Sequence, residues 1–93
     1  MSPLKTINVR FEVYDGVAES TATRLSTFYR DIEDDRSFPN SLFRDELQSV
    51  YDRLIRIHSS QSRYLIIRAY DENGSILGGV GHRTAHPFMI TEP

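Results

Sequence analysis

Apolar and polar residues alternate near the start of the chain, from residue 7 to residue 14. A period of two is typical of a strand that buries one face, because successive side chains point to opposite sides of a sheet. The pattern ends at Asp15-Gly16, and Asp15 can cap a helix that follows. A strand is therefore predicted over 7–14, and its buried face consists of Ile7, Val9, Phe11 and Val13.

A helix is predicted next, over 17–34. Three threonines in this segment lower its helix propensity. The acidic residues at 31 and 33–35 fall at its C-terminal end, which the helix dipole disfavours. They are interpreted as a solvated helix end or as a docking patch for arginine side chains. The apolar residues whose spacing suits one helical face are Val17, Leu25, Phe28, Tyr29 and Ile32.

A second helix is predicted over 40–58, after the break at Pro39. Asn40 or Ser41 can cap its start. Acidic residues in its first turn and basic residues near its end, His58 among them, match the helix dipole. Its apolar stripe recurs every three or four residues and consists of Phe43, Leu47, Val50, Leu54 and Ile57.

The C-terminal third of the chain predicts a β-hairpin with strands over 63–70 and 75–83. Asn73-Gly74 between two extended segments is a strong hairpin signal. The first of these strands is apolar on both faces, so it is expected in the centre of the sheet. Glycines at 78, 79 and 81 imply a bulge or a close neighbour in the second strand. Residues 84–93 are expected to form a tail, in which 88–90 add a short edge segment.

This order of elements (strand, helix, helix, strand, strand) predicts an α+β domain. Its small sheet has three or four strands, antiparallel or mixed, and is packed by two helices. A chain of 93 residues has room for a single domain over 1–93. Because the strand over 63–70 has two apolar faces, a homodimer is predicted, formed through a sheet edge or through the uncovered face.

Composition excludes several classes of chemistry. The chain has no cysteine, so disulfides, thiolate zinc sites and cysteine nucleophiles are ruled out. No apolar run approaches the roughly 20 residues of a membrane helix, so a cytoplasmic protein without a membrane partner is predicted. A net charge of -2 disfavours a nucleic-acid partner without excluding it. Ten arginines accompany a single lysine, which indicates an interaction surface or only the base composition of the genome.

The residues that could hold a metal or a cofactor do not form a complete motif. His82 and His86 are four residues apart, but only Glu92 is near enough to serve as a third ligand. The glycine-rich stretch over 74–81 lacks the third glycine of a dinucleotide-binding loop. It also lacks the Gly-Lys-Ser/Thr sequence of a phosphate-binding loop. No metal and no cofactor are therefore predicted.

Arginine and tyrosine side chains gather on the two C-terminal strands. These residue types are enriched among the residues that dominate protein–protein binding. On a sheet they could also stack single-stranded bases, although the negative net charge weighs against this interpretation. The predicted binding residues are Arg63, Tyr64, Arg68, Tyr70 and Arg83.

The segment YDENGSILGGV over 70–80 resembles a hairpin of the GNAT acetyltransferase superfamily. In that family an acidic-Gly turn is followed by a short residue, two aliphatic residues and glycine. The predicted order of elements over 7–83 is also similar to the N-terminal half of that fold. The resemblance implies a half-fold only, because the chain lacks the family's Arg/Gln-x-x-Gly-x-Gly/Ala loop, which binds acetyl-CoA. No catalytic or cofactor-binding residue is carried over from it.

Two functional hypotheses follow. The first is a small non-catalytic protein-binding domain that acts as a regulator or inhibitor, of the kind found among phage or plasmid accessory proteins. The alternative is a minimal enzyme, either a GNAT-like acyltransferase fragment or a ribonuclease similar to RelE-type toxins in length and in its VGHR ending at 80–83. For RNA cleavage, His82 would act as the general acid–base and Arg83 would hold the phosphate.

Overall fold

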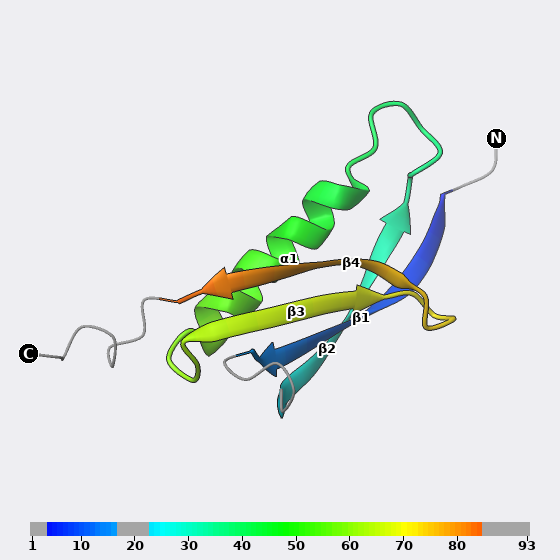
Figure 1. The fold of residues 1–93 in the computed structure, drawn as a ribbon. Helices are drawn as coiled ribbons and strands as arrows, with labels where there is room; N and C mark the ends of the chain where they lie inside the picture. The colour runs from blue at the N-terminus through cyan, green and yellow to red at the C-terminus, as the bar shows by residue number, and fades with distance from the viewer. Residues whose placement is uncertain (1–3, 17–22, 85–93) are drawn as a thin grey trace, which may run out of the picture.

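The computed structural model describes residues 4–16 and 23–84, which form a four-stranded antiparallel sheet with one helix on one of its faces (Figure 1). The strands are β1 (Lys5–Asp15), β2 (Thr23–Asp34), β3 (Tyr64–Tyr70) and β4 (Ile76–Arg83), and the helix is α1 (Phe43–His58). The strand order is β2-β1-β3-β4. β1 and β3 therefore lie in the centre of the sheet, and β2 and β4 form its edges.

The prediction of two helices is wrong, because the second element of the chain is a strand. The segment predicted as a helix over 17–34 contains β2 from residue 23 onwards, and its first six residues lie outside the described part of the chain. Its apolar spacing suits a helical face, but pairing with β1 determines its structure. Phe28 lies opposite Phe11, and Ile32 lies opposite Ile7. The threonine and aromatic residues of this segment favour the extended form.

The other predicted elements lie close to those observed. The strand predicted over 7–14 lies within β1, and the predicted hairpin corresponds to β3 and β4. β3 is a central strand as expected, although α1 covers only the face that carries Leu65, Ile67 and Ala69. The edge segment predicted over 88–90 and the residue His86 lie outside the described part of the chain.

The start of α1 differs from the prediction in both its position and its capping. The helix begins at Phe43, and Leu42 takes the N-cap position that was predicted for Asn40 or Ser41. The backbone N–H of Leu42 donates to the Asp35 carboxylate at 2.7 Å. The backbone N–H of Phe43 donates to the Ser41 hydroxyl at 3.2 Å. Asp35, predicted at the solvated end of a helix, therefore supports the start of the next one.

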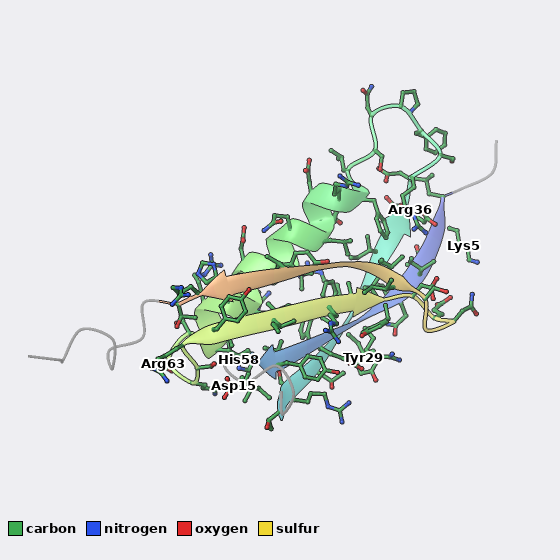
Figure 2. All side chains as sticks on the ribbon, viewed as in Figure 1. Lys5, Asp15, Tyr29, Arg36, His58 and Arg63 are labelled. Carbon is green, nitrogen blue, oxygen red and sulfur yellow. The ribbon has the colours of Figure 1, made fainter. Side chains whose placement is uncertain are left out.

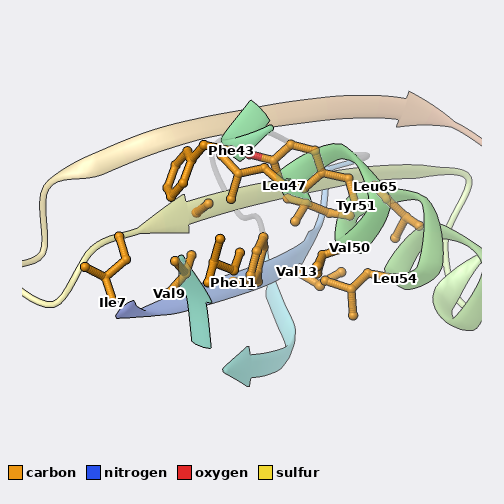
Figure 3. Close-up of a cluster of buried hydrophobic side chains, with 13 residues drawn as sticks. Ile7, Val9, Phe11, Val13, Phe43, Leu47, Val50, Tyr51, Leu54 and Leu65 are labelled. Carbon is orange, nitrogen blue, oxygen red and sulfur yellow. The ribbon is translucent and has the colours of Figure 1, made fainter. Parts of the chain in front are cut away.

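The hydrophobic core lies between α1 and one face of the sheet (Figure 3). At its centre the ring of Phe11 packs edge-on against Tyr51, with their ring centroids 5.8 Å apart. Ile57, predicted on the buried stripe of the helix, is 55% exposed because His58 takes the buried position in the last turn. The core side chains are Ile7, Val9, Phe11, Val13, Ile32, Phe43, Leu47, Val50, Tyr51, Leu54, Leu65, Ile67 and Ala69.

The turn between β3 and β4 has the chemistry that its sequence predicts. Asp71 accepts hydrogen bonds from the backbone N–H groups of Asn73 and Ser75, at 2.8 and 2.9 Å. Gly74 has a φ of 84°, a left-handed conformation that glycine adopts without steric cost. A register shift at Ala69/Tyr70 forms the bulge that the glycine-rich sequence implied. The turn therefore presents acidic residues at one end of the hairpin.

Candidate protein-binding surface

The sheet has a second face, opposite α1, which we call the open face. Its residues alternate with the core residues along β1 and β3, and their neighbours on β2 and β4 follow from the strand register. This face is a mixture of arginine, tyrosine and acidic side chains, in contrast to the apolar face beneath α1. Its members are Thr6, Asn8, Arg10, Glu12, Tyr14, Arg24, Thr27, Tyr29, Asp31, Glu33, Tyr64, Ile66, Arg68, Tyr70, Ile76, Gly79, Gly81 and Arg83.

Glu12 lies near the middle of the open face, and its side chain is only 11% exposed. Its carboxylate accepts hydrogen bonds from the Tyr14 hydroxyl and, at 2.9 Å, from Arg10 Nε, while Arg24 lies 3.9 Å away. The Tyr14 hydroxyl, followed by the two guanidinium groups, holds the pKa of Glu12 below its ordinary value of 4.5 although burial opposes this. The same carboxylate raises the pKa of the Tyr14 phenol above 10.0. The centre of the open face is therefore an ionised carboxylate whose partners belong to the chain itself.

Two stacked pairs connect β1 to β3 across the open face. The guanidinium group of Arg10 lies over the Tyr70 ring, 4.8 Å from its centroid. The guanidinium group of Arg68 lies over the Tyr14 ring at 5.6 Å. Such cation–π contacts hold long side chains in place on an exposed surface. Each of these two rings consequently has one face occupied by an arginine of the same chain.

An open groove of about 340 Å³ runs over β3 and β4 on the open face. The groove forms because Gly79 and Gly81 of β4 have no side chains to fill this part of the open face. At Gly81 a Cβ would collide with the side chain of Tyr64, which lies across this glycine. The groove is mainly apolar, with one guanidinium group beside it. The side chains that line it on the open face are Tyr64, Ile66, Arg68 and Ile76.

Four of the five predicted binding residues share the open face. Tyr64, Arg68 and Tyr70 alternate along β3, and Arg83 on β4 lies opposite Tyr64. Arg63 does not join them, because it precedes Tyr64 and the alternation places its side chain on the other side of the sheet. Figure 2 shows Arg63 at the same end of the molecule as Asp15 and His58.

The structure does not bring together the two residues considered for RNA cleavage. His82 and Arg83 are consecutive in β4, so their side chains leave the strand on opposite faces. His82 lies opposite Leu65, on the side of the sheet that α1 covers, whereas Arg83 lies on the open face. The two side chains therefore do not share a face of the sheet.

A second cavity, of about 420 Å³, lies beside the start of α1. Arg36 lines it and stacks over the Phe43 ring, 4.5 Å from the centroid. Two hydrogen bonds of 2.8 Å join the Arg36 guanidinium group to Asp34 and hold the pKa of that carboxyl at about 2. Arg36 lies near Lys5 at the far end of the sheet from Arg63 (Figure 2). Among the described residues, the Arg36 guanidinium group is thus paired with a carboxylate, whereas that of Arg68 beside the open-face groove is not.

The structure also contains a hydrogen-bonded chain that the sequence analysis did not predict. Ser26 Oγ lies 2.9 Å from His58 Nε2, and His58 Nδ1 lies 2.7 Å from Gln61 Oε1. A serine nucleophile needs a hydroxyl, an imidazole and an orienting acceptor in this order. However, His58 is only 8% exposed, and none of the three residues lines either cavity. These hydrogen bonds therefore have a structural role: they connect the end of α1 to β2 through His58 and Ser26.

Glu12, Arg10 and Tyr14 were not identified as site residues from the sequence. A signal for them existed, because they alternate with the core residues of the predicted first strand and must share its other face. What the sequence could not show is that β3, more than 50 positions later, supplies the residues that stack on them.

No family model, no curated protein and no solved structure matches this chain. The element order that linked the chain to the GNAT superfamily, with two helices after the first strand, is not the observed one. Within residues 4–16 and 23–84 no helix is long and apolar enough to cross a membrane. No group of three potential metal ligands occurs in the same ranges. The function of the open face must therefore be inferred from its own chemistry.

Proposed function

We propose that this chain is a small protein-binding domain, a regulator or inhibitor, whose partner docks on the open face over β3 and β4. The contact segment of the partner carries a carboxylate beside an apolar side chain. The apolar side chain fills the groove, and the carboxylate pairs with Arg68 beside it.

The observation that carries this proposal is the combination of an apolar groove with an available cation, Arg68, beside it. Among the described residues Arg68 forms no ion pair with a carboxylate, whereas Arg10 is already paired with Glu12. Arginine and tyrosine next to an apolar depression are typical of the residues that dominate protein interfaces. The stacking of Arg68 on Tyr14 holds this arginine in place before the partner arrives, which reduces the entropy lost on binding.

A protein partner fits this surface better than single-stranded nucleic acid does. Bases stack on free aromatic faces, but arginines of the chain already cover one face of Tyr14 and one face of Tyr70. The carboxylates of Glu12 and Asp31 on the same face would repel a phosphate backbone. The cytoplasmic location and the homodimer expected from the sequence remain predictions.

Photo-crosslinking in extract of the native host tests this proposal. A p-azidophenylalanine residue in place of Tyr64, which lines the groove, is expected to capture one discrete protein. The same residue in place of Tyr29, which lies on the open face of edge strand β2 and is 58% exposed, is the matched control and should not capture it. The adduct should disappear when Arg68→Glu is combined with the probe at position 64, because the substitution repels the partner's carboxylate.

Four results would overturn the proposal. Equal adducts from positions 64 and 29, or an adduct that persists in the Arg68→Glu background, would show that the groove does not select the partner. Capture of RNA at position 64 would assign the open face to nucleic acid instead. Turnover of acetyl-CoA or RNA by the purified chain would show that it is an enzyme.

A further inference from the structure

The two edges of the sheet differ in how well they are protected against pairing with another chain. β2 has 12 residues, and those at 24, 30, 31, 33 and 34 are charged. Charged side chains along an edge strand oppose edge-to-edge association. β4 has 8 residues, and Arg83 is the one arginine, lysine or acidic residue among them. From Ile76 to Gly81 this edge offers only apolar side chains and glycine.

The free backbone groups of β4 can be identified from its pairing with β3. The Thr84 N–H donates to the Arg63 carbonyl at 3.0 Å, so every second residue counted back from Thr84 bonds to β3. The N–H and C=O groups of Gly79, Gly81 and Arg83 consequently point away from β3. Within the described part of the chain, no strand pairs with this side of β4. Two of the three free positions are glycines, so no side chain obstructs an approaching strand there.

The hairpin of β3 and β4 also has opposite charges at its two ends. Asp71 and Glu72 lie in the turn, and Arg83 lies at the far end of β4. The Glu72 side chain is exposed, and its carboxylate accepts a 3.1 Å hydrogen bond from the backbone N–H of Asn8 on β1. When two such hairpins pair antiparallel, the basic end of each lies beside the acidic turn of the other. This arrangement is self-complementary in charge as well as in backbone hydrogen bonding.

We propose that a second copy of this chain pairs with β4 across a two-fold axis, which joins two four-stranded sheets into one. One register pairs the free backbone groups of the two β4 strands with each other. In this register Gly79 of one copy lies opposite Gly81 of the other, and Val80 lies on the two-fold axis. Arg83 then lies opposite Leu77 of the other copy, next to its acidic turn. The two Arg83 side chains stay about 20 Å apart, because six residues at about 3.4 Å each separate positions 77 and 83 along a strand.

This inference does not rest on the proposed function. Pairing uses the backbone edge of β4, whereas the heterologous partner is proposed to dock on the open face. The Arg68→Glu substitution distinguishes the two proposals. It should abolish the crosslink at position 64 to the heterologous partner and leave the mass of the dimer unchanged.

The mass in solution tests the proposal. Light scattering and sedimentation at micromolar concentrations should return twice the chain mass of 10.7 kDa. Ile76→Lys places a cation beside Arg83 of the other copy and should weaken the dimer by about tenfold or more. Ile76 is 63% exposed, so this change should not unfold the chain. The matched control is Ile57→Lys, an equally apolar residue on α1 that is 55% exposed, which should leave the dimer unchanged.

Reversal of the two charges tests the register. Arg83→Glu and Glu72→Lys should each weaken the dimer, and the double variant should restore it because the attraction between the basic end of one hairpin and the acidic turn of the other returns with opposite sign. A monomer at all concentrations up to about 100 μM would overturn the proposal. So would a dimer that Ile76→Lys and Ile57→Lys weaken equally, or a double variant weaker than either single one. A dimer lost when residues 87–93 are removed would assign the contact to the C-terminal segment and overturn it as well.

Discussion

On the face of the sheet that α1 covers, β1 and β3 contribute apolar side chains that are almost fully buried, whereas on the open face the same strands contribute arginine, tyrosine and glutamate. The covered face is held together by close packing, as between Phe11 and Tyr51. The open face is held together by specific pairs, such as Arg10 with Tyr70. The difference shows that the alternation along one strand can separate the residues that stabilise a small domain from those available for binding.

The largest effect is expected on the covered face. Phe11→Ala removes a fully buried ring that contacts Phe28 and Tyr51 and should lower the free energy of unfolding by about 3–5 kcal/mol. Tyr70→Ala, on the open face, removes a half-buried ring of similar size and should cost about 1 kcal/mol. Urea denaturation followed by circular dichroism measures both values. Equal losses would show that the open face is part of the core.

A smaller effect is expected from Glu12 at the centre of the open face. Glu12→Gln keeps the shape of the side chain but loses its charge, so its bonds to Tyr14 and Arg10 weaken. We expect the free energy of unfolding to fall by about 1–2 kcal/mol. Asp31→Asn, an exposed residue on the same face, should cost less than about 0.5 kcal/mol. If the two substitutions had the same effect in urea denaturation, the network around Glu12 would not be stabilising.

The same network predicts how stability depends on pH. The folded pKa of Glu12 is lowered below 4.5, so the unfolded chain takes up this proton first and stability falls as the pH drops from about 5. The folded pKa of Tyr14 is raised above 10.0, so the unfolded chain loses this proton first and stability falls as the pH rises past about 10. In Glu12→Gln both slopes should become shallower. Urea denaturation across this pH range measures them, and unchanged slopes would contradict the prediction.

The smallest effect is expected from a polar atom on the covered face. The Tyr51 hydroxyl is buried and has no hydrogen-bond partner among residues 4–16 and 23–84, and burial raises the pKa of its phenol above the ordinary value. Tyr51→Phe removes a group that lost its water on folding and gained no bond, so the stability should change by less than about 0.5 kcal/mol or increase. Thermal unfolding of the variant measures this. A loss of more than about 1 kcal/mol would reveal a partner for this hydroxyl.

The sequence predicted the elements whose periodicity is set within one segment. Ile7, Val9, Phe11 and Val13 alternate so regularly that only a strand accommodates them, and the stripe of α1 recurs over four turns. The segment that became β2 was mispredicted because Leu25, Phe28 and Ile32 fit one helical face, whereas a strand accommodates all three only through the register shift beside Leu25. Its structure is decided by pairing with β1, which depends on residues outside the segment.

The candidate site was likewise predicted only in part: the residues within one strand or hairpin were identified, and those that depend on the pairing of distant strands were not. Tyr64, Arg68 and Tyr70 are separated by even numbers of residues, so a strand necessarily places them on one face. The position of Arg83 beside them follows from the hairpin turn. The partners of Glu12 and the groove above Gly81 could not be predicted, because both depend on which strands become neighbours.

The pairing of β1 with β3 has a consequence for how the chain reaches its structure. β2 lies next to β1 in the sequence, and β4 lies next to β3, so these two pairs can form locally. The six residue pairs between β1 and β3 join positions that are 50 apart (Asp15 with Leu65) to 60 apart (Arg10 with Tyr70). Closing so long a loop costs conformational entropy before most of the stabilising contacts exist, and such distant contacts slow folding. The meeting of the two hairpins, with α1 packing across them, is therefore expected to set the refolding rate of the chain.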